Sequence, residues 1–146
     1  MRELRTEIEI EATPGRIWEI LTDFDSYSEW NPFIRDIRGQ PVGGTRLDVK
    51  IQPPGGREMS FRPTVLEAEP EQELRWLGRL LLPGIFDGEH SFRLESAAGA
   101  HVRFLQVERF GGLLVPLFGQ TLERTRRGFD AMNEALKHRA ESSIST

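Results

Sequence analysis

The segment PLFGQTLERTRRGFDAMNEALKH, residues 116–138, decides the fold that we predict for this chain. Its apolar residues recur at steps of three and four, the spacing of one face of an α-helix. They are Phe118, Leu122, Phe129, Met132 and Leu136, with Thr125 in the remaining slot. Pro116 suits a first helical turn, where its missing N–H costs nothing. A helix of this length runs about 35 Å, so a sheet is needed to cover the apolar stripe.

Upstream of this helix, apolar and polar side chains alternate with a period of two, which predicts strands. The expected strands cover residues 4–11, 33–38, 45–52, 59–68, 73–80, 86–95 and 101–110. Short loops favour antiparallel neighbours, and Pro63 marks an edge or a bulge. Thr13 and Pro14 predict the start of a short helix that ends near Asp23, and a further helical turn is expected over 26–30. The predicted class is α+β: a curved antiparallel sheet of about seven strands around the C-terminal helix, with two short helices after the first strand.

Length and composition indicate one domain over residues 1–146, with a disordered tail at about 141–146. The net charge of −4 argues against nucleic-acid binding, and the absence of cysteine excludes thiolate chemistry. No apolar run is long enough for an integral membrane segment, and the charged N-terminus does not resemble a secretory signal. We therefore expect a cytoplasmic monomer or homodimer. No cofactor is expected, and no metal, because the three histidines lack metal-ligand spacing.

The sequence resembles the START-like, helix-grip superfamily, also called SRPBCC proteins, over nearly the whole chain. The similarity is to the branch described as polyketide cyclase/dehydrase and lipid transport. The residues that carry it are Thr13-Pro14, Ile17-Trp18, Thr22-Asp23, Tyr27, Trp30-Asn31-Pro32-Phe33, Gly44-Thr45, Gly88-Glu89-His90-x-Phe92 and the run 108–114. The resemblance implies a sheet that grips the C-terminal helix around a ligand cavity. It does not select an activity, because this fold hosts carriers, cyclases and chaperone activators.

Three polar residues are expected on the concave face of the sheet. Under the period-two rule, His90 shares a face with Phe86, Gly88, Phe92 and Leu94, and Gln106 and Glu108 share one with Val102, Phe104 and Phe110. If the hairpin turns midway between Ala97 and Gly99, His90 lies opposite Gln106, Phe92 opposite Phe104, and Glu108 opposite Gly88. Burying such groups unpaired costs a few kcal/mol. They should therefore bond one another, water or a ligand.

The sequence leaves two interpretations of these residues open. The polar side chains can simply satisfy each other inside the sheet, and the aromatic residues can be plain core. Alternatively they line a pocket, since ligand pockets are mainly apolar and aromatic with few polar anchors. The candidate ligand-binding residues are Phe24, Trp30, Phe61, Trp76, His90, Phe92, Phe104, Gln106, Glu108, Phe118 and Leu122. No catalytic residue is assigned.

Three functions are compatible with the sequence. The first is the binding of an apolar or aromatic small molecule, as a carrier or sensor. The second is an enzyme of the cyclase or dehydratase type, in which His90 or Glu108 moves a proton in the same cavity. The third is a protein-interaction module of the chaperone-activator kind, which works through the exterior of the sheet.

Overall fold

The computed structural model of the chain describes residues 2–80, 86–112 and 119–142. In chain order the elements are β1 (Arg2–Ile10), α1 (Pro14–Thr22), the 3-10 turn η1 (Phe24–Ser26), α2 (Tyr27–Trp30), β2 (Ile34–Arg38), β3 (Asp48–Ile51), β4 (Met59–Phe61), β5 (Thr64–Glu69), β6 (Glu73–Leu80), β7 (Phe86–Ser96), β8 (Val102–Gly111) and α3 (Gly119–Glu141). The predicted start of the long helix at Pro116 lies outside the described residues, as does most of the predicted tail. The described part of the helix is continuous and ends at Glu141.

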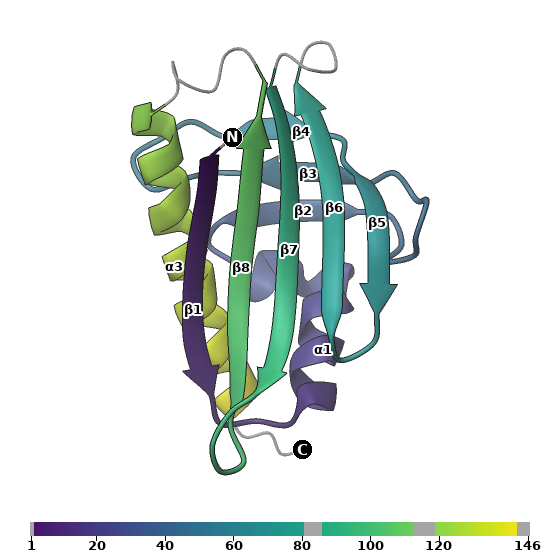
Figure 1. Cartoon of the computed structure of the whole chain (residues 1–146), viewed down its shortest axis with the longest axis vertical. Helices are drawn as coiled ribbons and strands as arrows, with labels where there is room; N and C mark the ends of the chain where they lie inside the picture. The colour runs from purple at the N-terminus through teal and green to yellow at the C-terminus, as the bar shows by residue number, and fades with distance from the viewer. Residues whose placement is uncertain (1, 81–85, 113–118, 143–146) are drawn as a thin grey trace.

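The strands form two antiparallel sheets, and α3 packs behind the larger one (Figure 1). The larger sheet has the order β1-β8-β7-β6-β5, and the smaller has the order β2-β3-β4. In Figure 1 the strands of the smaller sheet run across the back of the larger sheet, beside α3. The predicted α+β class, with an antiparallel sheet around a C-terminal helix, is confirmed.

The strand count differs from the predicted seven, because the stretch expected as one strand over 59–68 is two. β4 pairs with β3, whereas β5 pairs with β6 in the other sheet. The chain changes sheets at Arg62 and Pro63, between these strands. Pro63 cannot donate a hydrogen bond to a strand ladder, which ends β4 there. Its carbonyl instead accepts from the Leu47 N–H at 2.8 Å. The proline therefore marks a change of sheet and, as predicted, an edge, because β4 and β5 are edge strands of their sheets.

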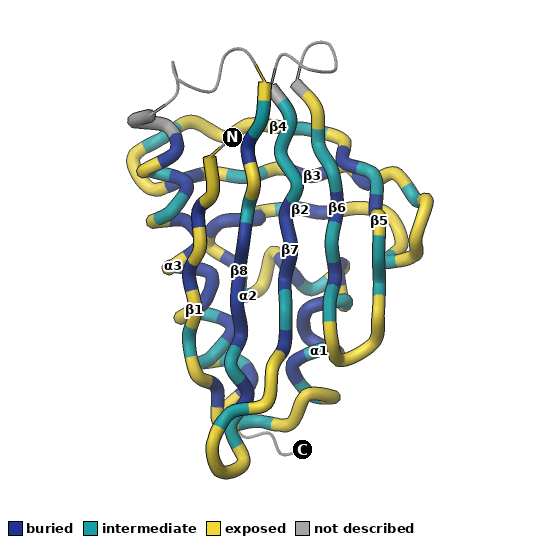
Figure 2. Tube along the Cα trace, viewed as in Figure 1, coloured by how far each residue is buried: buried dark blue, intermediate teal, exposed yellow. Residues whose placement is uncertain are grey.

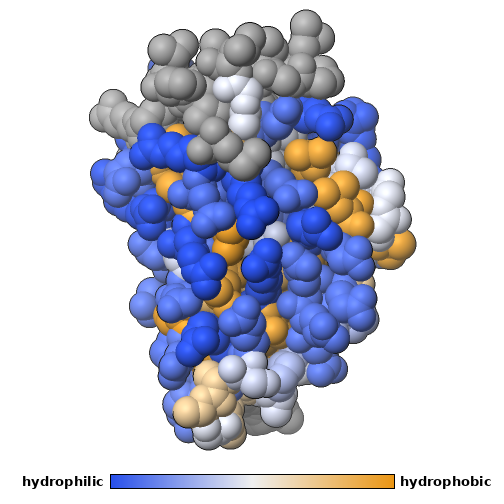
Figure 3. Space-filling view, viewed as in Figure 1, coloured by the Kyte–Doolittle hydropathy of each residue, from blue (hydrophilic) through white to orange (hydrophobic). Residues whose placement is uncertain are grey.

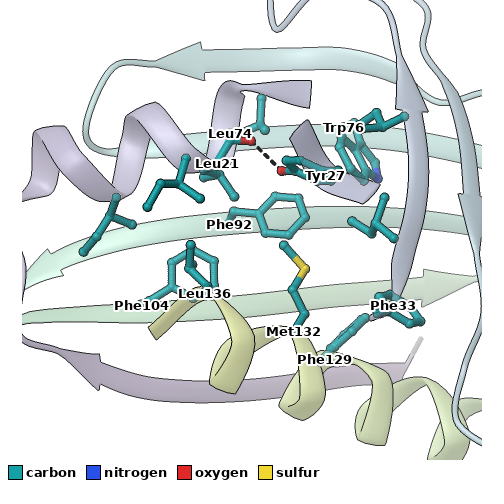
Figure 4. Close-up of a cluster of buried hydrophobic side chains, with 14 of the residues drawn as sticks. Leu21, Tyr27, Phe33, Leu74, Trp76, Phe92, Phe104, Phe129, Met132 and Leu136 are labelled. Carbon is teal, nitrogen blue, oxygen red and sulfur yellow. Dashed lines mark hydrogen bonds between the residues drawn. The ribbon is translucent and has the colours of Figure 1, made fainter. Parts of the chain in front are cut away.

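The core lies between the larger sheet and α3. Figure 2 shows the buried positions concentrated on the inner elements, and Figure 4 shows Phe129, Met132 and Leu136 of α3 directed at the sheet. These three side chains are fully buried, as are Phe92 and Phe104 opposite them. The period of three and four residues therefore assigned the buried face of α3 correctly.

The short helices close one end of this core. Thr13 caps α1 by accepting from the Arg16 N–H at 3.1 Å, and Pro14 occupies the first turn, as predicted. After the helix, the Tyr27 hydroxyl donates to the Leu21 carbonyl at 2.5 Å (Figure 4). Burial raises the pKa of the Tyr27 phenol well above its usual value, so the hydroxyl keeps its proton.

Charged side chains cover the outer face of the larger sheet, which Figure 3 shows as mostly hydrophilic. Arg75 lies within 3.6 Å of both Glu73 and Glu89, and Arg93 lies 3.4 Å from Glu73. At the free edge of β1, cations of α3 reach the backbone. Arg126 donates to the Arg5 carbonyl at 3.2 Å, and Lys137 donates to the Glu9 carbonyl at 2.8 Å.

Candidate functional site

Two glycines face each other on the inner side of the larger sheet. Gly78 of β6 pairs with Gly88 of β7. The next inward-facing row across the sheet carries Trp76, His90 and Glu108, which are direct partners in β6, β7 and β8. Since these two glycines project no side chains, they leave space between the sheet and the elements that cover it, beside Phe110 in the same row.

A cavity of about 160 Å³ occupies this space. Its wall is mainly apolar and combines both sheets with α3. The apolar contributors include Ile34, Ile51, Phe61, Trp76, Phe110 and Leu122. The polar contributors include His90 and Glu108, which lie side by side in neighbouring strands. This composition, an apolar wall with a few polar groups, is that of a small-molecule site.

The polar groups of the wall are in direct contact. His90 Nδ1 lies 2.6 Å from Glu108 Oε1, a distance typical of a charge-assisted hydrogen bond. The His90 side chain is 4% exposed and that of Glu108 is 15% exposed, so the carboxylate is the more accessible partner. The second carboxylate oxygen, Oε2, lies above the Cα of Gly88, 2.5 Å from the point where a Cβ would be. Glycine at position 88 therefore makes room for the carboxylate.

The His90–Glu108 pair is the end of a longer chain of buried hydrogen bonds. His90 Nε2 lies 3.0 Å from Gln106 Oε1, and Gln106 Nε2 donates to Asn133 Oδ1 at 2.8 Å. Asn133 Nδ2 in turn donates to the Thr6 hydroxyl at 3.0 Å. The chain thus runs from β1 through α3 to the cavity. Buried hydrogen-bond networks of this kind hold their members in place.

Aromatic rings enclose the imidazole. His90 stacks on Phe92 with ring centroids 4.3 Å apart, and it meets the edge of Phe129 at 4.8 Å. Trp76 lies at 5.7 Å on a further side. These contacts fix the ring plane.

The register of the β7–β8 hairpin differs from the prediction by two residues. His90 pairs with Glu108 instead of Gln106, Phe92 pairs with Gln106 instead of Phe104, and Gly88 pairs with Phe110 instead of Glu108. The reason is the turn, which closes between Ala97 and His101 and is centred on Gly99 with φ of +71°. A slip of two residues leaves each side chain on its predicted face. The three polar residues therefore still meet, but in a different order.

The candidate residues fall into four groups. Phe61, Trp76, His90, Glu108 and Leu122 line the cavity. Phe24, Phe92, Phe104 and Gln106 are buried and do not line it, while Trp30 lines a separate, more polar groove beside α1 and the end of α3. Phe118 lies outside the described residues. The ligand-binding roles of all these residues stay predictions.

Several residues of the site were not among the candidates. Phe33, Met59 and Thr125 line the cavity, and Asn133 continues the polar chain. Asn133 had a detectable signal, because it lies four residues after Phe129 and three before Leu136, on the buried side of the helix. No sequence signal pointed to Phe33 or Met59, because their place in the cavity depends on how the smaller sheet folds over the larger one.

Other kinds of site find no support in the described parts of the chain. Within residues 2–80, 86–112 and 119–142, no cluster of three histidine, aspartate or glutamate side chains is placed to hold a metal ion. Over the same ranges, no helix combines the length and the apolar character needed to cross a membrane.

Comparison with known proteins identifies the family of the chain. The family model described as polyketide cyclase / dehydrase and lipid transport matches residues 1–141. No curated protein matches the chain. Among solved structures, a START superfamily protein from Mycobacterium smegmatis is similar with a TM-score of 0.72 and 19% identity, over 95% of this chain and 97% of that chain.

Two further solved structures are similar to the chain. The di-domain ARO/CYC StfQ from the steffimycin biosynthetic pathway has a TM-score of 0.68 and 10% identity, over 96% of this chain and 52% of that one. The Aha1 dimer from Colwellia psychrerythraea has a TM-score of 0.66 and 21% identity, over 94% of this chain and 97% of that one. At these identities the likeness shows the fold alone, which confirms the predicted START-like, helix-grip fold.

Proposed function

Because the chain belongs to the polyketide cyclase / dehydrase and lipid transport family, we propose that it binds a small apolar or aromatic molecule in the cavity at Gly78 and Gly88, as a carrier or sensor. The observation that carries this proposal is the cavity itself. It is bounded by apolar side chains from both sheets and α3, and it has a polar pair at one point of its wall.

The volume of the cavity limits the size of the ligand. At about 160 Å³ it is smaller than common ligand sites, which measure roughly 300–1,000 Å³. An apolar cavity of about 150 Å³ is known to admit benzene. The expected ligand is therefore a single-ring aromatic compound or a short-chain apolar one.

Titration with toluene, followed by NMR spectroscopy, tests this proposal. We expect saturable binding with a dissociation constant on the order of 100 μM, or about −5.5 kcal/mol, with the largest shifts at Trp76 and Leu122. Leu122→Trp should abolish this binding by filling the cavity. Arg127→Ala, on the exposed face of the same helix, is the matched control and should bind like the natural chain. Equal binding by the two variants would contradict the proposed location.

A second function is favoured by one observation, the carboxylate–imidazole contact in the cavity wall. Such a pair can donate a proton to a bound substrate or accept one from it, as an enzyme of cyclase or dehydratase type requires. The cavity volume favours binding over this alternative, because a polyketide chain is larger than a single ring. Turnover of a small hydroxylated ring ketone to its dehydrated product, lost in His90→Ala, would favour the enzyme.

The interaction-module alternative depends on the outer face of the larger sheet. Ion pairs such as Arg75–Glu89 and Arg109–Glu3 cover that face. Protein interfaces have cores depleted in charged residues, so this face is a poor match to a permanent partner.

A further inference from the structure

The Gln106 side chain faces one ring nitrogen of His90. The amide nitrogen of Gln106 lies 3.3 Å from the Phe129 carbonyl, a group that only accepts hydrogen bonds. That contact places the amide nitrogen toward α3 and leaves the amide oxygen facing His90 Nε2 at 3.0 Å. In this amide orientation His90 Nε2 donates to Gln106, and with the Gln106 and Asn133 amides both turned over Gln106 donates to Nε2 instead.

The contact between His90 and Glu108 needs one proton. It lies between Nδ1 and Oε1, which are 2.6 Å apart. That proton belongs either to the imidazole, which then donates to a carboxylate, or to a carboxylic acid, which then donates to the imidazole. Both arrangements use Oε1 in the contact.

The other carboxylate oxygen is therefore an acceptor in both arrangements. As part of a carboxylate, or as the carbonyl of the acid, Glu108 Oε2 presents lone pairs and no hydrogen. It lies over Gly88, and both residues line the cavity. Within the described part of the chain, the structure gives this oxygen no hydrogen-bond donor. An apolar ligand that displaces water from it leaves a buried acceptor unpaired, which is unfavourable.

We propose that the cavity selects apolar ligands that carry a hydrogen-bond donor, of the phenol, alcohol or arylamine class, over acceptor-only ligands such as carboxylates. The donor bonds Glu108 Oε2 while the ring lies against the apolar wall. This inference rests on the proposed binding function and names its ligand class. Arg79 is the only lysine or arginine among the described residues of the wall, and it already forms an ion pair with Asp87 at 3.7 Å. It therefore offers a carboxylate ligand little compensation.

Phenol and toluene are the probes that separate the two proposals, because they have the same number of heavy atoms and differ in the donor. Their dissociation constants are measured by NMR titration, together with that of benzoate. We expect the toluene-to-phenol ratio of dissociation constants to be at least about tenfold larger in the natural chain than in Glu108→Met. Benzoate should bind weakest of the three.

Two further variants keep the test decisive. Glu108→Gln retains an acceptor toward the cavity while its amide N–H donates to His90 Nδ1, so it should keep most of the preference for phenol. Gly88→Ala leaves the carboxylate in the chain, but a Cβ would lie 2.5 Å from Oε2 and must displace it. It should therefore lower the ratio even if Glu108→Met fails to fold.

The outcomes are distinguishable. A ratio that is the same in the natural chain, in Gly88→Ala and in any folded Glu108→Met would overturn the donor preference while leaving toluene binding, and hence the proposed function, in place. Tighter binding of benzoate than of phenol would also overturn it. If neither ring compound binds the natural chain, the proposed function fails and the inference fails with it.

Discussion

The inner face of the larger sheet has a filled half and a hollow half, although both lie against the same helix. In the filled half, β7 and β8 present Phe92 and Phe104. On the opposite side, α3 contributes Met132 and Leu136, and all four side chains are fully buried. In the hollow half, β6 and β7 present Gly78 and Gly88. The backbone is continuous through both halves. The difference therefore lies in side-chain volume, and a pair of glycines is enough to turn a packed core into a cavity.

The largest expected effect contrasts the same substitution in the two halves. Phe104→Ala, in the filled half, should lower the free energy of unfolding by about 3–5 kcal/mol, because it leaves a void in a packed core. Phe61→Ala, at the half-buried wall of the cavity, should cost less than about 2 kcal/mol, since its ring is already partly unpacked. Urea denaturation measures both. Equal costs would mean that the hollow half is as well packed as the filled one.

A second prediction concerns the point where α3 meets Phe33, the residue before β2. A Cβ at Gly128 would overlap the carbons of the Phe33 ring. Gly128→Ala should therefore destabilise the protein by about 1–3 kcal/mol through overpacking. Helix propensity alone predicts the opposite sign, a gain of about 1 kcal/mol. A thermal unfolding midpoint above that of the natural chain would show that Phe33 yields easily.

A third prediction acts on the cavity with little effect on stability. In Gly78→Ala the new methyl group would lie 3.2 Å from the Phe61 ring, which has to move by only a few tenths of an ångström. The free energy of unfolding should change by less than about 1.5 kcal/mol. Toluene binding should weaken, because the methyl group reduces the space above the two glycines. Unchanged toluene affinity would show that these glycines do not define the cavity.

The smallest expected effect is at an exposed contact far from both halves. The Glu11 N–H donates to Glu141 at 2.7 Å, and this bond, with Lys137, lowers the pKa of the Glu141 carboxyl. The ionised Glu141 carboxylate therefore stabilises the folded state fully above the ordinary carboxyl pKa, and this stabilisation is lost as the pH falls through the lowered pKa. Glu141→Gln should therefore cost a few tenths of a kcal/mol near pH 7, and the difference should vanish in acid.

Denaturant titrations at several pH values measure this difference. Glu134→Gln, on the exposed side of the same helix, is the control for the removal of a carboxylate from α3. A gap between Glu141→Gln and the natural chain that persists at low pH would contradict the electrostatic origin of the effect.

The sequence predicted which face of a strand each side chain occupies better than it predicted the strand register or the shape of the cavity. Alternation with a period of two placed His90, Gln106 and Glu108 on one face, because burial of one side of a strand leaves a local signature. Their pairing depended on the turn at 97–101, whose length the alternation does not encode. The cavity depends on two neighbouring positions that carry no side chain. Gly78 and Gly88 become neighbours only when β6 and β7 are paired, which the sequence of either strand does not show.

The rest of the site depends on contacts between distant segments. Phe33 and Met59 reach the cavity because the chain changes sheets at Pro63 and folds the smaller sheet over the two glycines. No local pattern carries that information. Phe24 and Phe104 were candidates because they are aromatic, a property that a packed core and a ligand pocket share.

The cations that α3 places along β1 have a consequence for self-association. A free strand edge with unpaired carbonyls is a template on which a second chain can add a strand, which is a common route to aggregation. Here Arg126 and Lys137 occupy the carbonyls of Arg5 and Glu9. The helix thus shields the edge of the sheet as well as covering its inner face. Loosening α3 from β1 would expose that edge, so variants that detach the helix should precipitate before they lose all secondary structure.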